Sequence, residues 1–80
     1  MKLPRDVAGA ELVRALAKLG YGVSRQSGSH MRLTTERGGT HHITVPAHSP
    51  LKVGTLAAIL DDIAGHAKLD RGQLLDLLFG

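Results

Sequence analysis

The spacing of apolar residues changes twice along this chain of 80 residues, and these changes restrict its fold class. Three segments alternate between apolar and polar residues, as β-strands with one buried face do: Tyr21–Arg25, His30–Thr35 and Thr40–Val45. On either side, apolar residues recur every three or four positions, which predicts amphipathic helices over about Ala8–Leu19 and about Gly54–His66. The pattern therefore indicates an α+β domain in which one helix precedes three antiparallel strands and another follows them.

Residues typical of helix caps stand at the ends of these segments. Gly20 suits a left-handed C-cap of the first helix, and Gly54 or Thr55 is expected to start the second. Asp70, with Gln73 three residues later, resembles a capping box that opens a third helix. Its apolar face is expected to comprise Leu74, Leu75, Leu77 and Leu78. Because so short a chain has a small core, this helix is expected to complete the core rather than to bind a partner.

Matching of apolar faces predicts how the first two strands pair, since a slip of one residue would turn the apolar side chains toward water. Val23 is expected opposite Met31, which leaves Gln26–Gly28 as a three-residue loop. Loops of this length need a residue with positive φ, and Gly28 stands at that position.

The second hairpin follows from the same reasoning. Leu33 is expected opposite Ile43, which leaves Glu36–Thr40 as the turn and places His30 opposite Pro46. The helices are expected to cover one face of the sheet and to leave the other open. The open face is then expected to carry Ser24, His30, Arg32, Thr34, His42 and Thr44.

The composition excludes several classes of function. The chain has no cysteine, which excludes disulfides, thiolate zinc sites and a thiol nucleophile. No apolar run approaches the length of about 18 residues that suggests a membrane span. The first residues do not resemble a signal peptide, so no membrane partner and a cytoplasmic location are expected. Two aromatic residues, Tyr21 and Phe79, are too few for RNA binding by base stacking.

Positive charge is concentrated in the middle of the chain. Residues 21–54 contain four basic side chains and one acidic side chain, a net of +3, whereas residues 55–80 have a net of −2. Four of the five histidines also lie in the middle segment: His30, His41, His42 and His48. A polyanion such as nucleic acid is expected to bind there, although this net charge is also ordinary for a soluble protein.

The histidine after the first predicted turn is the best candidate for chemistry. His30 follows Gly28-Ser29, on the polar face of its strand and near Arg25 and Arg32. Imidazole exchanges protons at neutral pH, and guanidinium groups bind phosphate through paired donors. RNA supplies its own nucleophile, the 2′-hydroxyl, so one histidine with nearby cations would cleave RNA without a metal. From spacing alone, an ordinary polar strand residue is the more frequent explanation of such a histidine.

The remaining histidines do not predict a metal site. His41 and His42 are neighbours on a strand, so their side chains point to opposite faces and cannot ligate one ion without distortion. A second possible set of ligands consists of His30, His42 and His48. Their spacing differs from that of known zinc motifs, and only Glu36 is a nearby carboxylate. His66, near the end of a predicted helix, is expected to interact with the helix dipole or to act as a cap.

These residues together resemble the HicA-type (YcfA-like) mRNA interferase toxins of bacterial and archaeal toxin–antitoxin modules. The resemblance covers almost the whole chain. It rests on Lys2–Arg5, Leu12–Gly20 with its Leu-Gly-Tyr end, Arg25–His30 followed by Arg32-Leu33, His41–Pro46, His48, and Leu51–Leu56 leading to Ile59-Leu60. The Gly28-Ser29-His30 turn and the Gly54-Thr55-Leu56 helix start are each weak evidence for this family, but together they are specific for it.

The resemblance implies one HicA-like domain over residues 1–80, with a fold similar to a double-stranded-RNA-binding domain. It implies metal-independent cleavage of mRNA by His30 without a cofactor, and a HicB-type antitoxin protein that covers the site and represses the operon. The residues expected to bind RNA are Arg25, Ser27, Gly28, Ser29, Arg32, His42, His48 and Lys52. Family members often carry lysine at the position of Ser27, so Arg25 or Arg32 would supply that phosphate contact here.

The sequence also fits two other functions. A non-catalytic RNA-binding module of the same fold would show the same basic middle segment, and a metal-dependent enzyme is the third hypothesis. The group that protonates the leaving 5′ oxygen is open among His42, His48 and water. A homodimer is compatible with the sequence.

Overall fold

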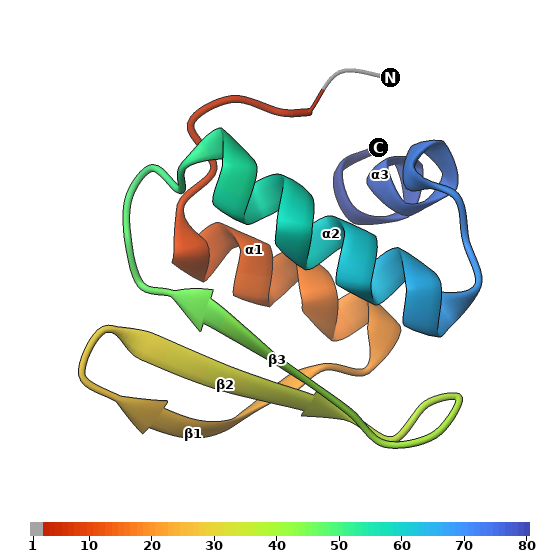
Figure 1. The fold of residues 1–80 in the computed structure, drawn as a ribbon, viewed down its shortest axis with the longest axis horizontal. Coiled ribbons are helices and arrows are strands. Elements are labelled where there is room, and N and C mark those ends of the chain that lie inside the picture. Colours follow the sequence, from red (N-terminus) through yellow and green to blue (C-terminus); the bar gives the residue numbers. More distant parts are fainter. Residues whose placement is uncertain (1–2) are drawn as a thin grey trace.

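The helices form one layer and the sheet forms the other (Figure 1). The computed structural model describes residues 3–80. Lys2, the first residue of the Lys2–Arg5 segment that resembles the HicA-type toxins, lies outside the described residues. The elements are α1 (Gly9–Leu16), a 3₁₀ helix η1 (Ala17–Leu19), β1 (Gly22–Ser27), β2 (His30–Thr35), β3 (His41–Pro46), α2 (Val53–Ala67) and α3 (Arg71–Phe79). The strands form an antiparallel sheet of order β1-β2-β3. Helices cover one face of this sheet, which confirms the predicted α+β fold.

Two of the predicted helix caps are confirmed and one is wrong. Gly20 ends η1 in the left-handed region with φ of 81°. At α3 the Gln73 N–H donates to Asp70 Oδ1 (2.7 Å) and the Asp70 N–H donates to Gln73 Oε1 (3.0 Å), which completes the capping box. The second helix starts earlier than expected. Lys52 is its N-cap without a side-chain cap, and α2 already includes Gly54 and Thr55.

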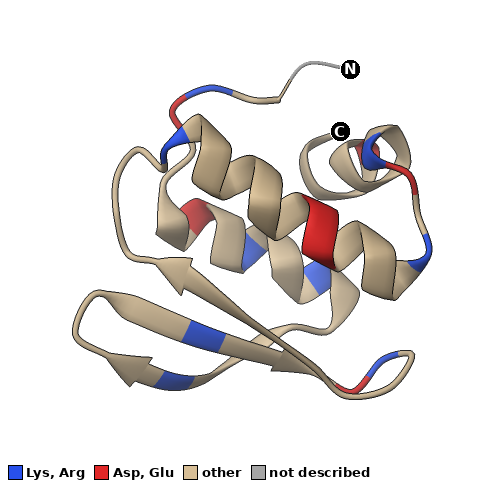
Figure 2. Cartoon of the chain, in the orientation of Figure 1, with Lys and Arg blue, Asp and Glu red and all other residues tan. Residues whose placement is uncertain are grey.

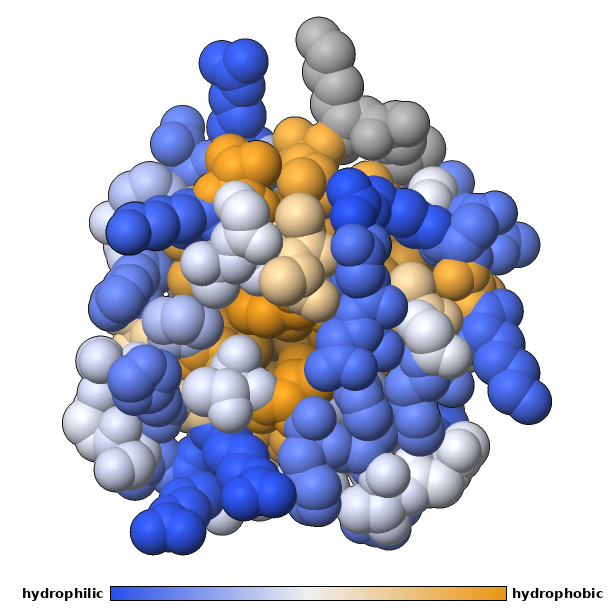
Figure 3. Space-filling view, in the orientation of Figure 1, coloured by the Kyte–Doolittle hydropathy of each residue, from blue (hydrophilic) through white to orange (hydrophobic). Residues whose placement is uncertain are grey.

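The core lies between the inner face of the sheet and the three helices. Its largest fully buried apolar side chains are Leu12, Leu16, Leu33, Val45, Leu56, Leu60, Ile63 and Leu74. Figure 3 shows mostly hydrophilic side chains over the strands, and hydrophobic atoms between hydrophilic side chains over the helical layer.

The third helix completes the core, as predicted. Leu74, Leu75 and Leu78 are buried, and Lys18 Nζ of η1 donates to the Leu78 carbonyl oxygen (3.2 Å), near the end of α3. The inclusion of Leu77 in the apolar face is wrong, because this side chain is 44% exposed. Residues 74, 75 and 78 share one side of a helix, and residue 77 points away from it.

The predicted register is confirmed for the second hairpin. Leu33 pairs with Ile43 and His30 pairs with Pro46, so residues 36–40 form the turn. Met31, Leu33, Ile43 and Val45 are all buried on the helix side. A buried face on both strands fixes this register.

The predicted register of the first hairpin is wrong. Val23 pairs with Leu33 rather than with Met31, and Ser27 pairs with His30 around a two-residue turn of Gly28 and Ser29. The register shifts between Val23 and Arg25, which makes Ser24 the extra residue of a β-bulge. The face-matching argument failed because β1 is an exposed edge strand in which Val23 is 48% exposed.

Gly9 offers a test of how tightly the first helix approaches the sheet. Its N–H donates to the His48 carbonyl oxygen (2.9 Å), and an added Cβ would overlap the Pro46 carbonyl oxygen. We expect Gly9→Ala to lower the free energy of unfolding by about 1–3 kcal/mol, because backbone has to shift. Gly65→Ala is the control: no atom lies within 4 Å of the added Cβ. This second change is expected to raise stability by up to about 1 kcal/mol. Urea denaturation measures both, and equal effects would contradict the close approach.

Within residues 3–80, none of the helices has the length and hydrophobicity needed to cross a bilayer.

Candidate nucleic-acid interface

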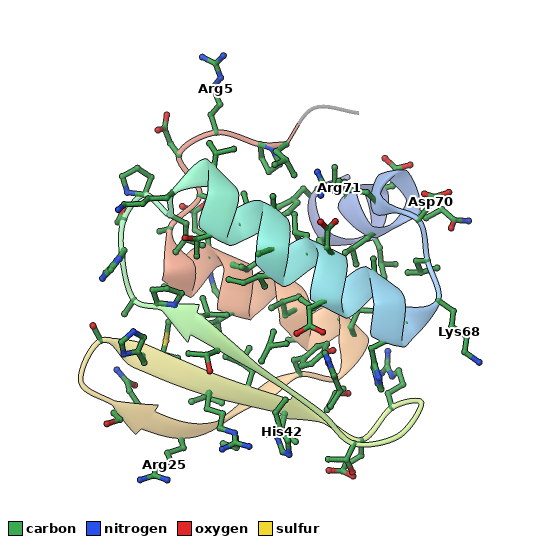
Figure 4. All side chains as sticks on the ribbon, viewed as in Figure 1. Arg5, Arg25, His42, Lys68, Asp70 and Arg71 are labelled. Atoms are coloured by element: carbon green, nitrogen blue, oxygen red, sulfur yellow. The ribbon has the colours of Figure 1, made fainter. Side chains whose placement is uncertain are left out.

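The face of the sheet that points away from the helices is polar. All six residues predicted for it lie there: Ser24, His30, Arg32, Thr34, His42 and Thr44. On β2 and β3 the alternate residues fill the core on the other side, and Ser24 Oγ lies 2.8 Å from Thr34 Oγ1 on the open face. Thr34 is half-buried, and the other five are exposed. Figure 4 shows His42 pointing away from the helical layer. The open face therefore presents imidazole, hydroxyl and guanidinium groups to solvent.

The β-bulge adds Arg25 to this face. Strict alternation from Tyr21 and Val23 would turn Arg25 toward the helices, but the extra residue Ser24 places it directly opposite Arg32. Figure 4 shows Arg25 on the same side of the sheet as His42.

The two arginines form an unusual cross-strand pair. Like charges directly opposite each other in a sheet are destabilising. Among residues 3–80, neither Arg25 nor Arg32 forms a salt bridge with a carboxylate. Figure 2 shows these two basic positions on β1 and β2, whereas the acidic residues lie on the helices, the loops and the turn after β2. The open face thus has positive charge that nothing on the face neutralises.

The turn before β2 leaves His30 accessible. Gly28 has φ of 58°, and no atom lies within 4 Å of a Cβ built on it. His30 is exposed, and its ring has no hydrogen-bond partner within the part of the chain that the structure describes. A ring in this position can approach a bound molecule without breaking any contact of the fold.

His48 lies at the same end of the sheet as His30. The Ala47 N–H donates to the Ser29 carbonyl oxygen (2.6 Å), which continues the pairing of His30 with Pro46 by one residue. The His48 carbonyl oxygen accepts from Gly9, so the backbone of the exposed His48 is fixed against α1.

His42 lies at the opposite end of the open face. It pairs with Thr34, which is four residues from His30 on β2. At a rise of about 3.3 Å per residue, His30 and His42 are separated by about 13 Å along the sheet. The two rings are therefore too far apart to contact the same phosphate group.

The other predicted RNA-binding residues divide into two groups. Ser27, Gly28 and Ser29 form the end of β1 and the turn, adjacent to His30. Lys52 is exposed but stands at the N-cap of α2, in the helical layer rather than on the open face. The hairpin of β1 and β2 thus carries five of the predicted residues: Arg25, Ser27, Gly28, Ser29 and Arg32. His48 lies at the same end of the sheet as the turn, whereas His42 lies at the opposite end and Lys52 in the helical layer.

The neighbouring histidine His41 belongs to the fold rather than to the open face. Its Nδ1 lies 2.6 Å from Tyr21 Oη, and its Nε2 lies 3.0 Å from Asp62 Oδ1 on α2. Its ring also stacks on that of His66, with centroids 4.4 Å apart. These contacts confirm that His41 and His42 point to opposite faces. Among residues 3–80, no group of three or more histidine and acidic side chains is placed to hold a metal ion.

His66 lies in the last turn of α2, as predicted, and its ring also contacts a segment far away in the sequence. Its Nε2 donates to the Arg37 carbonyl oxygen (3.0 Å), so the ring ties α2 to the turn between β2 and β3. A cavity of about 330 Å³ lies beside it, on the helix side of this turn, and its lining includes Tyr21, Arg37 and Leu69. Local sequence patterns do not predict this cluster, because its members come from three separate segments, residues 19–21, 35–38 and 66–69.

Tyr21 makes stability depend on pH at the alkaline end. Burial, and secondly the negative charge of Asp62, raises the pKa of the Tyr21 hydroxyl. A pKa raised by folding stabilises the protein below the unfolded value of about 10, and this contribution is lost as the pH rises through the folded value. Tyr21→Phe is expected to cost about 1 kcal/mol at pH 8, through the lost hydrogen bond to His41. The difference from wild type should shrink above pH 10 in urea denaturation, and a constant difference would contradict this coupling.

Comparison with protein families identifies what this arrangement is similar to. Residues 9–65 match a family model described as HicA toxin of bacterial toxin-antitoxin. The matched segment contains α1, the whole sheet and most of α2, and it ends before α3. Neither the curated proteins nor the solved structures compared with this chain include a match.

Proposed function

The chain belongs to the HicA family of toxins from bacterial toxin–antitoxin systems, and from this premise we propose that it is an endoribonuclease that cleaves mRNA. In this proposal His30 exchanges protons with the substrate, and no metal takes part. The RNA lies along the open face of the sheet, on the arginines and the Gly28-Ser29 turn.

The opposed arginines are the observation that supports this proposal most. Arg25 and Arg32 have no carboxylate partner within residues 3–80. They form the next cross-strand pair on the open face after that of Ser27 and His30, two residues along each strand. A phosphate diester between them would relieve their mutual repulsion and accept paired hydrogen bonds from both guanidinium groups. A phosphate held there brings its neighbouring ribose toward the imidazole of His30.

The chemistry needs only the substrate and two proton-exchanging groups. His30 takes the proton of the 2′-hydroxyl as the 2′ oxygen attacks the adjacent phosphorus. The bond from phosphorus to the 5′ oxygen breaks, and the 5′ oxygen takes a proton from a general acid. His48 is the better histidine for that acid, since it lies at the same end of the sheet and His42 does not. The products are a 2′,3′-cyclic phosphate and a 5′-hydroxyl.

A non-catalytic RNA-binding module is the second candidate function. The observation that favours it is the His30 ring, which no side chain orients within residues 3–80. General bases are usually oriented by a further hydrogen bond, although this bond often forms only when substrate is present.

A cleavage assay with purified protein separates these functions. We expect single-stranded RNA to be cut in the presence of EDTA, with cyclic phosphate and 5′-hydroxyl ends identified by mass spectrometry. Intact RNA that is nevertheless bound would support the RNA-binding module. Cleavage abolished by EDTA would instead indicate a metal-dependent enzyme.

A toxin of this family functions together with an antitoxin. We propose that the partner is a HicB-type protein that covers the open face, and that both act in the cytoplasm, where mRNA is present. Coexpression with the neighbouring reading frame should yield a stable complex that no longer cuts RNA.

A further inference from the structure

A row of hydrogen-bonded side chains crosses all three strands at the far end of the open face. Ser24 Oγ lies 2.8 Å from Thr34 Oγ1, and Thr34 Oγ1 lies 2.7 Å from His42 Nδ1. Ser24 Oγ also lies 3.2 Å from the Arg32 carbonyl oxygen. Ser24 is the extra residue of the β-bulge and forms the β1 end of this row. The same bulge turns Arg25 onto the open face.

The three contacts fix where the protons lie. A carbonyl oxygen only accepts, so Ser24 must give its single hydroxyl proton to the Arg32 carbonyl. Ser24 then accepts from Thr34, which uses the single proton of Thr34. Thr34 Oγ1 must therefore accept from His42, which requires a proton on His42 Nδ1. All three contacts are hydrogen bonds at once only in this arrangement.

The row consequently determines what His42 presents to solvent. A neutral imidazole with its proton on Nδ1 has a lone pair on Nε2, so Nε2 accepts hydrogen bonds. His42 is exposed, and its ring is held by Thr34 rather than free to flip. The neighbouring row carries Arg25 and Arg32, which only donate. The far end of the face thus holds an oriented acceptor beside two donors.

We infer that His42 accepts a hydrogen bond from a ribose 2′-hydroxyl and so lets this face distinguish RNA from DNA. Arg32 pairs with Thr44, two residues from His42, so a phosphate on the arginine row lies about 7 Å along the strand from the His42 row. The sugar is joined to that phosphate, and its 2′-hydroxyl is the donor that DNA lacks.

This role rests on the proposed function but is separate from its chemistry. About 13 Å lie between the rows of His30 and His42, so His42 binds a different nucleotide from the one that is cut. His42 is therefore a specificity residue, and Thr34 and Ser24 position it.

The proton arrangement is testable without RNA. Nitrogen-15 chemical shifts of the imidazole rings in the full chain should show His42 above pH 8 with its proton on Nδ1. Thr34→Val should release this tautomer preference, and Thr34→Ser should keep it. A wild-type ring with its proton on Nε2 would overturn the inference.

Binding tests the recognition of ribose. His30→Ala protein, which is not expected to cut, is titrated with an RNA oligonucleotide and with the same sequence bearing 2′-fluoro groups, which have no 2′-hydroxyl proton to donate. We expect RNA to bind about three- to tenfold more tightly, the effect of one hydrogen bond. His42→Phe and Thr34→Val should reduce this ratio to about one, whereas Thr34→Ser keeps it. Circular dichroism melts check that each variant is folded.

The outcomes separate the two proposals. Equal affinity for both oligonucleotides overturns the role of His42, and cleavage by wild-type protein then still supports the nuclease. If RNA still binds more tightly than the 2′-fluoro oligonucleotide after His42→Phe, another group contacts the 2′-hydroxyl and the role of His42 is overturned. The same holds if the affinity ratio falls when inosine replaces guanosine in both oligonucleotides, because the contact is then to a base. A ratio that depends on His42, together with no cleavage by wild-type protein, overturns only the nuclease.

Discussion

Replacing His30 by alanine is expected to slow RNA cleavage by about 10²–10⁴-fold, the usual contribution of a positioned acid–base group. Stability should change by less than about 0.5 kcal/mol, since the ring is exposed and makes no hydrogen bond within residues 3–80. Initial rates on an end-labelled RNA, with thermal melts of both proteins, measure the two effects.

The control for His30 is Thr44→Ala, an exposed position on the same face. It should leave both rate and stability near wild type, because its side chain makes no hydrogen bond within the described residues. If His30→Ala cleaved RNA at the wild-type rate, the proton transfer would have to be assigned elsewhere. If it lost RNA binding together with cleavage, His30 would be a contact residue rather than the acid–base group.

The sequence was sufficient to predict the second hairpin because burial constrains it on both strands. Met31 and Leu33 alternate with polar residues on β2, and Ile43 and Val45 do so on β3. Only one register buries all four, so turn length and open face follow from it. The open-face position of His30 was predictable for the same reason.

The first hairpin lacks this constraint. β1 is exposed along its length, so the apolar pattern of Val23 carried little information about pairing. A bulge arises from one extra residue and leaves no mark in the alternation. The position of Arg25 opposite Arg32, which is the main support for phosphate binding, could therefore be found only from the structure.

The two adjacent histidines show a further limit of sequence reasoning. Alternation predicted correctly that His41 and His42 face opposite ways. Their partners were not predictable, because Tyr21 and Asp62 lie 20 and 21 residues from His41 in the sequence. Local spacing identifies the side to which a residue points, and tertiary packing decides what it meets.

Removing both opposed arginines is expected to weaken RNA binding and to stabilise the fold. In Arg25→Gln/Arg32→Gln, affinity for single-stranded RNA at low salt should fall at least about tenfold, because each charge-assisted hydrogen bond contributes about 1.5–3 kcal/mol. The dependence of log affinity on log salt should flatten by about 0.7, the value for one neutralised phosphate on a single strand. Filter binding or fluorescence anisotropy between low and moderate salt measures both quantities.

The matched control removes two positive charges elsewhere. Arg5 lies in the segment before α1 and Lys68 at the end of α2, both away from the open face (Figure 4). Arg5→Gln/Lys68→Gln has the same net charge as the double arginine variant, so it corrects for the general attraction of a basic protein to RNA. It should retain most of the affinity, and an equal loss in both variants would contradict a specific phosphate site on the sheet.

Stability gives the second half of this test. Relief of the repulsion between Arg25 and Arg32 should raise the free energy of unfolding by about 0.2–1 kcal/mol, the range of cross-strand pair effects. Arginines that served the fold would change stability in the opposite direction when removed. A loss of binding together with a gain in stability would therefore show that the pair opposes folding and is retained for its ligand.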